Sequence, residues 1–182
     1  MRRPLVLAAV LLLAGCGGGG ELEPVKPVRA AEPQRVELGW RESYPSTGER
    51  LVFVVEALEI TKRGWSADIA VANSTEIPFE LGAIQEPLAF GLMLFETGNL
   101  DELEQAAEAG RLPAPRLAGQ IEPAPPDELA PDQTWRATIS APGSLADGTF
   151  VRVSFGPLRA RGEPPAGMEP VVQWITDRSY RL

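Results

Sequence analysis

The alternation of apolar and polar residues between positions 65 and 71 is the feature that most constrains the fold of this chain. One face of an extended strand would carry Trp65, Ala67, Ile69 and Val71, and the other Ser66, Asp68 and Ala70. Successive side chains of a strand point to opposite faces, so this period predicts a half-buried strand. The apolar run Leu51–Ile60 precedes it, and a turn at Lys62, Arg63 and Gly64 lies between them. The two segments therefore predict a β-hairpin.

The rest of the folded part has the same character. Residues 135–140 and 151–155 also alternate, and the loop around Gly143 and Gly148 between them predicts a second hairpin. Shorter apolar segments predict further strands at Phe79–Ile84, Leu88–Glu96, Val171–Ile175 and Ser179–Leu182. With 18 Gly and 18 Pro, the 182-residue chain favours turns over long helices. We predict a single all-β domain, an antiparallel β-sandwich of about seven strands.

One segment interrupts this strand pattern. Asn99 can cap a helix that runs from Leu100 to about Ala109, in which Glu102 would complete a capping box and Gly110 would end the helix. Its apolar face would consist of Leu100, Leu103 and Ala107. Residues 111–133 follow with six prolines. We expect this long crossing loop to move the chain between the two sheets or to form a lid.

Residues 1–15 have the layout of a secretory signal. Arg2 and Arg3 precede an apolar stretch, Leu5–Leu13, which is too short to span a hydrocarbon core that needs about 20 residues. The sequence Leu13-Ala14-Gly15-Cys16 then resembles the lipobox of bacterial lipoproteins. This resemblance implies cleavage before Cys16 and diacylglycerol on its thiol. The protein would then sit on the extracytoplasmic face of the cell membrane, or on an outer membrane if the host has two.

The chain after this signal divides into two parts of different composition. Residues 16–35 are rich in Gly and Pro and predict a flexible tether, and residues 36–182 form the predicted domain. Without Arg2 and Arg3 the chain has 15 basic residues against 25 acidic ones, a formal charge of −10. Such an acidic surface weighs against nucleic acid and anionic lipid as partners.

Few residues of the chain are suited to catalysis. The chain has no histidine, which removes the commonest general base and the commonest transition-metal ligand. Its single cysteine is assigned to the lipid, and Lys62 lies in a predicted turn. Acidic residues of the helix, such as Asp101 and Glu104, are typical of a solvated helix start. We therefore expect no enzyme, no cofactor and no metal, with a hydrolase built on carboxylates as a further alternative.

Aromatic and basic residues are the candidates for contact with a partner. Trp65 and Trp135 alternate in phase with apolar neighbours, which favours a place in the core. The other two tryptophans could stack on a sugar, and two arginines in a Gly- and Pro-rich loop could meet an anionic wall polymer or the acids of an envelope protein. These four candidates are Trp40, Trp174, Arg159 and Arg161.

The number of strands, the hairpins and the Asn73–Thr75 turn resemble the immunoglobulin-like domains of bacterial envelope lipoproteins. The resemblance covers residues 36–182, which contain no cysteine pair of the kind found in antibody domains. It implies a domain that binds a partner or acts as a spacer. We expect a non-catalytic interaction or spacer module at the cell envelope, with a small-ligand or envelope-glycan binding lipoprotein as the alternative.

Overall fold

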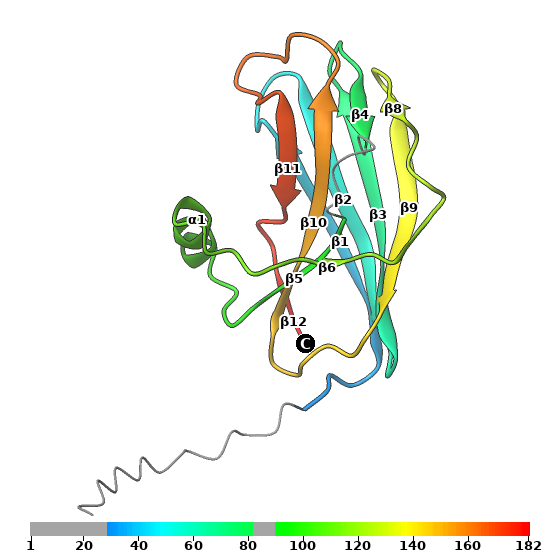
Figure 1. Ribbon diagram of the computed structural model, residues 1–182, viewed down its shortest axis with the longest axis vertical. Coiled ribbons are helices and arrows are strands. Elements are labelled where there is room, and N and C mark those ends of the chain that lie inside the picture. The colour runs from blue at the N-terminus through cyan, green and yellow to red at the C-terminus, as the bar shows by residue number, and fades with distance from the viewer. Residues whose placement is uncertain (1–28, 82–89) are drawn as a thin grey trace, which may run out of the picture.

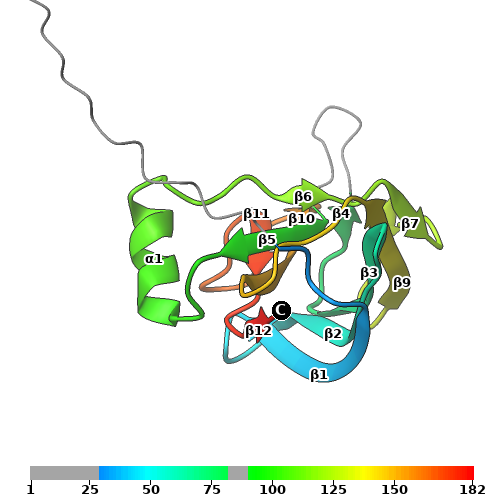
Figure 2. The same ribbon diagram turned by 90° about the horizontal axis from the view of Figure 1, so that it is seen from below.

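A computed structural model describes residues 29–81 and 90–182 of the chain. Twelve strands and one helix are found in these residues, and the strands form two antiparallel sheets (Figure 1). Seen from below, the two sheets form separate layers, and the helix stands outside the second sheet (Figure 2). The predicted all-β sandwich with one short helix is therefore confirmed. The strands outnumber the predicted seven partly because the crossing loop contributes three short ones.

The first sheet is built on the predicted amino-terminal hairpin. Its order is β1 (Gln34–Tyr44), β2 (Arg50–Ile60), β3 (Gly64–Ser74), β9 (Thr134–Pro142) and β7 (Gln120–Glu122). In the hairpin, Val55 lies opposite Ile69, and the four residues predicted to face inward from β3 are all 3% exposed or less. Ala70, predicted to face outward, is also buried, because it packs on the outer face against Val52 and Val54.

The second sheet is organised around one long strand, β10 (Phe150–Ala160). Along one edge it pairs with β5 (Gly91–Phe95) and β4 (Phe79–Leu81), and along the other with β11 (Val171–Ile175) and β12 (Tyr180–Arg181). β6 (Arg116–Leu117) extends the sheet from β5, and β8 (Glu128–Leu129) extends it from β4. The register of β10 shifts after Phe155 at Gly156, which has a φ of 113°. A Cβ atom there would lie 2.7 Å from the carbonyl oxygen of Val172, so the bulge requires glycine.

The predicted second hairpin is wrong in its pairing. Both strands exist, as β9 and β10, but β9 pairs with β3 and β7, whereas β10 lies in the opposite sheet. The connecting loop crosses the sandwich, and its Leu145 is 1% exposed in the core. The alternation in these strands identified the faces that are buried, and an arch between layers produces the same alternation as a hairpin.

An aromatic cluster joins the two layers. Phe53 of β2 stacks on Trp174 of β11, with ring centroids 5.6 Å apart and an interplanar angle of 5°. Phe53 also meets Phe155 of β10 at 5.2 Å, and Phe90 meets both Phe155 and Trp135. Such offset and edge contacts add to the burial of apolar area, so this cluster is a main source of attraction between the sheets.

The helix α1 (Leu100–Glu108) begins where predicted, but its cap differs. The side chain of Asn99 accepts from the backbone N–H of Asp101 at 3.0 Å. The backbone N–H of Asn99 donates to the hydroxyl oxygen of Thr97, so the predicted capping box with Glu102 is absent. Gly110, at a φ of 63°, follows the helix end as predicted.

The segment 111–133 moves the chain between the two sheets, which was one of the two roles predicted for it. It adds β6 to the second sheet, then β7 to the first, then β8 to the second. The folded part also begins earlier than residue 36, because β1 starts at Gln34 and the backbone N–H of Ala31 donates to Leu145 at 2.8 Å. The signal, Cys16 and most of the tether lie outside the described residues. In the described part of the chain, no helix is long and apolar enough to cross a membrane.

Candidate functional site

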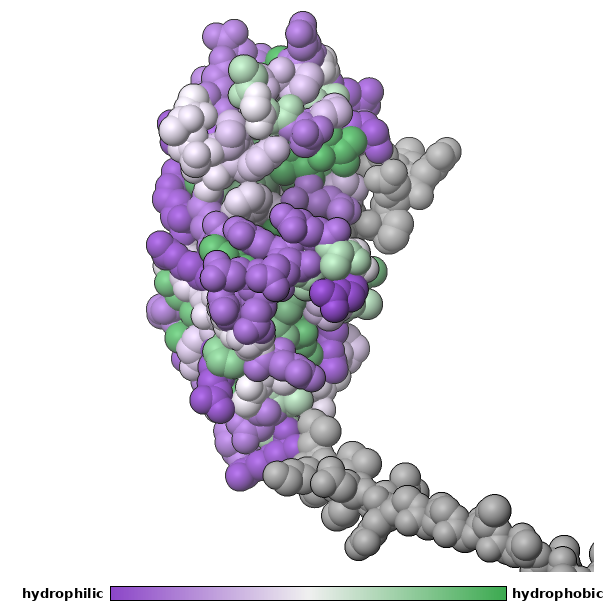
Figure 3. Space-filling model, turned by 90° about the vertical axis from the view of Figure 1, so that its left-hand side faces the viewer, coloured by the Kyte–Doolittle hydropathy of each residue, from purple (hydrophilic) through white to green (hydrophobic). Residues whose placement is uncertain are grey.

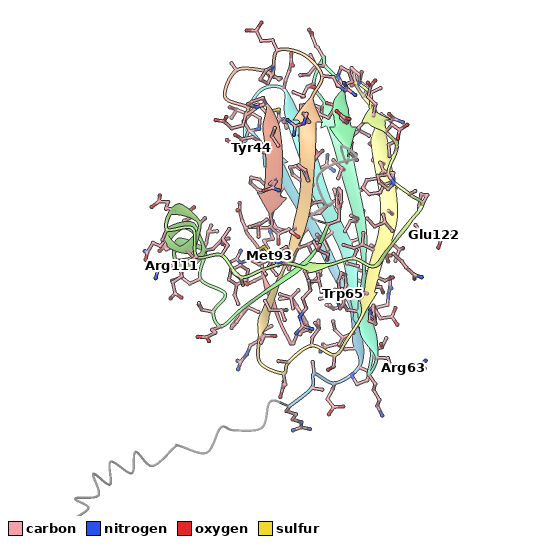
Figure 4. All side chains as sticks on the ribbon, viewed as in Figure 1. Tyr44, Arg63, Trp65, Met93, Arg111 and Glu122 are labelled. Carbon is pink, nitrogen blue, oxygen red and sulfur yellow. The ribbon has the colours of Figure 1, made fainter. Side chains whose placement is uncertain are left out.

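A cleft of about 640 Å³ lies between α1 and the outer face of the second sheet. The helix and the segment that follows it form one wall, and β5, β10 and β11 form the other. In Figure 4, Met93 lies between the strands and the helix end marked by Arg111. The lining residues are Met93, Leu100, Leu103, Glu104, Ala107, Leu112, Pro113, Ala114, Pro115, Ser154, Phe155, Gln173, Trp174, Ile175 and Asp177.

The period of the strands places apolar residues on this outer face. In β5, Leu92 faces the core and is fully buried, so Met93 points to the opposite side, where it is only 4% exposed. In β11, Ile175 alternates in the same way with Trp174 and lies opposite Ser154 of β10. On the facing wall, the predicted apolar face of α1 lines the cleft, and Leu103 is buried. Figure 3 shows this side of the molecule, where apolar residues (green) are visible beside polar ones (purple).

A buried arginine holds the segments around the cleft together. Arg152 of β10 is fully buried, and its guanidinium donates to the carbonyl oxygens of Thr176 at 2.7 Å, of Asp177, and of Gly98 at 3.0 Å. Its charge lies 5.6 Å from the centre of the Phe95 ring. Burial lowers the pKa of Arg152, although it stays far above neutrality for this residue type. The side chain therefore ties the start of α1 to the turn after β11.

Glu42 of β1 connects the first sheet to the same turn. Its carboxylate accepts from the indole N–H of Trp174 at 2.9 Å, and from the backbone N–H groups of Asp177 at 2.9 Å and Arg178 at 3.1 Å. Hydrogen bonds to a charged acceptor are stronger than neutral ones. Glu42 therefore closes this end of the sandwich and fixes the position of Asp177 at the rim of the cleft.

The rim of the cleft is acidic. Glu104 of α1 and Asp177 both line it, and neither makes an ion pair with another described residue. Burial raises the pKa of Asp177, the negative charges of Glu42 and Glu104 raise it further, and Arg152 offsets this only in part. A cation placed at this rim would relieve the repulsion between the carboxylates.

Replacing Asp177 with asparagine is expected to stabilise the protein at neutral pH but not in acid. The folded state binds the Asp177 proton more tightly than the unfolded state, in which the pKa is near 3.8. The stability of the natural protein therefore falls as pH rises from about this value through the higher folded pKa. Urea unfolding from pH 3 to 7 should show the two proteins equal in acid and Asp177→Asn more stable at neutrality. A difference that does not change with pH would contradict this assignment.

The four predicted contact residues do not gather in one place. Trp40 is 8% exposed and lies in the core, so its ring is not available to a sugar. Trp174 is half-buried and lines the cleft. Its ring packs on Phe53, and its indole N–H donates to the carboxylate of Glu42. Arg159 lies within β10, and Arg161 pairs with Glu80 at 3.3 Å. Contact of Trp174, Arg159 and Arg161 with a partner stays a prediction.

Sequence reasoning missed Arg152 and the β11 wall. The helix face was predicted, but Gln173 and Ile175 were not linked to it, because the period of a strand does not reveal what covers its outer face. In the described ranges, no three acidic side chains come together as metal ligands. A second hollow of about 600 Å³ lies beside Arg63 and Ser140, at the end of the sheet where β3 meets β9, and it lacks a covering helix.

No protein-family model matches the chain, no curated protein matches it, and no solved structure matches its fold.

Proposed function

We propose that this chain is a lipid-anchored, extracytoplasmic binding module of a bacterial cell envelope, which performs no catalysis and holds its partner in the cleft beside α1. The cleft carries this proposal. A spacer requires only a stable body, whereas in this chain a helix and the proline-rich segment after it line a largely apolar space of about 640 Å³ together with residues of β5, β10 and β11. Ligand sites in proteins are commonly apolar hollows of roughly 300–1,000 Å³ with a few polar groups.

The amino-terminal sequence supports the anchored location. A signal that ends in Leu13-Ala14-Gly15-Cys16 is followed by a Gly- and Pro-rich tether, whose flexible reach is about 25 Å for 20 residues. The loop between β9 and β10 is bonded to Arg29, whose carbonyl oxygen accepts from the backbone N–H of Asp147 at 2.8 Å, and to Ala31, whose backbone N–H donates to the carbonyl oxygen of Leu145 at 2.8 Å. The helix α1, which forms one wall of the cleft, stands at the side of the sandwich and not at this end (Figure 1). A partner beside the anchored protein could therefore reach the cleft without displacing the domain from the membrane.

Site-specific photo-crosslinking in intact cells tests both parts of this proposal. A photoreactive phenylalanine is placed at Ala114, which is exposed and lines the cleft, and as a control at Thr134, which is exposed on the opposite sheet. Membrane fractionation comes first: the natural protein should be in the membrane fraction, and a Cys16→Ser variant should not. We then expect a discrete crosslinked product from position 114 and none from position 134.

The opposite results would reject the proposal. Equal crosslinking from both positions, or none from position 114, would remove the cleft as the binding site. A product that contains a glycan or small molecule would retain the binding module and select the alternative ligand class. Membrane association that survives Cys16→Ser would reject lipid on this cysteine as the anchor.

A further inference from the structure

The strand β11 has an open edge. Among the described strands, β11 pairs only with β10. Just after β11, the backbone N–H of Thr176 donates to the carbonyl oxygen of Val153 in β10 at 3.0 Å, so the backbone groups of Thr176 point toward β10. Backbone groups of an antiparallel strand point alternately to its two sides. The backbone groups of Gln173 and Ile175 therefore point away from β10. Asp177 continues this series, and its N–H is bonded to Glu42.

The open part of this edge lies at the cleft. Gln173 and Ile175 both line the cleft, and Leu103 and Leu112 lie on its other wall. An added strand would lie about 4.8 Å from β11, within hydrogen-bonding distance of its outward groups. Alternate side chains of that strand would point toward the apolar wall formed by α1. Unpaired strand edges bind extended peptides in this way, with the main chain supplying affinity and the side-chain pockets supplying specificity.

The negative charge of the rim favours an occupant with positive charge. Glu104 and Asp177 are both exposed at the cleft and have no ion-pair partner among the described residues. The first turn of α1 adds two more acidic residues, and its last turn has no basic one. A second copy of this chain is a poor occupant, because the chain without its signal has a formal charge of −10 and two copies would repel each other.

We propose that the cleft binds an extended, basic and apolar peptide segment of another envelope protein, which adds to the open edge of β11 as a further strand and pairs its cations with Glu104 and Asp177. This inference rests on the proposed function, because it names the class of partner for the same cleft.

Calorimetric titration of the full lipidated protein in detergent tests the inference with defined probes. The first probe is an acetylated and amidated octapeptide that alternates valine with arginine and threonine. The second has the same sequence with N-methyl groups along one strand edge, and the third has glutamate in place of arginine. We expect binding of the first probe that weakens with added salt, and at least about tenfold weaker binding of the other two.

Variants of the protein test separately how the open edge of β11 and the acidic rim contribute to peptide binding. Gln173→Pro removes an N–H that points away from β10, a change that an edge strand tolerates. It should weaken binding of the first probe about tenfold, while the melting temperature of the protein stays close to that of the natural protein. The double variant Glu104→Gln with Asp177→Asn should abolish most of the salt dependence. Glu108→Gln, at the other end of the same helix and outside the cleft, is the matched control and should bind normally.

Several results would overturn the inference. These are equal binding of the N-methylated probe, unchanged binding to Gln173→Pro, or no binding of any peptide. Sedimentation that shows a dimer lost in Gln173→Pro would make a second copy the occupant, against the inference. If the probes fail while crosslinking from Ala114 persists in cells, the cleft remains the proposed binding site and only the peptide class is wrong.

Discussion

Arg152→Met is expected to lower the free energy of unfolding by about 3–5 kcal/mol, which is a large part of the stability of a domain this size. The guanidinium supplies the donors for the carbonyl oxygens of Gly98, Thr176 and Asp177. Replacing both partners of a buried polar pair with apolar groups can be neutral. Here the partners are backbone carbonyls that remain after the substitution, so the buried carbonyl of Thr176 would lose its donor without gaining water, and the part-buried carbonyls of Gly98 and Asp177 would lose theirs.

Urea unfolding followed by tryptophan fluorescence measures this effect. Arg181→Met is the matched control, because Arg181 also lies over an aromatic ring, that of Phe150 at 5.8 Å, but is exposed. The control substitution should lower the free energy of unfolding by no more than about 1 kcal/mol. Arg152→Lys should fall between the two, because an ammonium group cannot reach carbonyls in the fixed geometry of a guanidinium. A loss below about 1 kcal/mol for Arg152→Met would show that the three carbonyls find other donors.

Arg152 also shows where sequence reasoning stops. It alternates with the buried residues Val151 and Val153, so its position predicts a solvent-facing side chain, yet it is fully buried. The alternation correctly predicts which side chains of β3 and β10 face the core, because that depends only on local period. It does not contain the information that the segment before α1 and the turn after β11 come together around this side chain, at Gly98, Thr176 and Asp177.

The same limit explains the pairing of β9 and β10 and the cleft itself. Residues 135–140 and 151–155 have the pattern of a hairpin, but the pairing of β9 with β3 and the burial of Leu145 in the connecting loop show an arch between the sheets. The apolar face of α1 was readable from its spacing, and so one wall of the cleft was predictable. The other wall depends on which strand of the second sheet lies opposite, and this is a property of the topology.

The second large effect is expected at Asn73, where replacement by leucine should lower the free energy of unfolding by about 2–4 kcal/mol. Its side chain is 1% exposed and uses its full hydrogen-bonding capacity. The amide nitrogen donates to Ile77 at 2.7 Å and Leu129 at 3.0 Å. The amide oxygen accepts from the backbone N–H of Thr75 at 3.0 Å and its hydroxyl at 2.8 Å.

These bonds tie the end of β3 to β8, and thus the first sheet to the second, so their loss should also loosen the crossing loop. Asn73→Asp keeps both acceptor contacts and loses both donors, and we expect it to recover little of the stability because a buried carboxylate would face two carbonyl oxygens. Ser74→Ala, at the exposed neighbouring position, is the control and should change stability by less than about 0.5 kcal/mol.

Urea unfolding gives the stabilities, and hydrogen exchange of the Leu129 and Gln133 amides reports on the order of the crossing loop. If Asn73→Leu unfolds at the same urea concentration as Ser74→Ala, then the side-chain bonds of Asn73 do not hold the two sheets together, and the aromatic cluster between the layers must suffice.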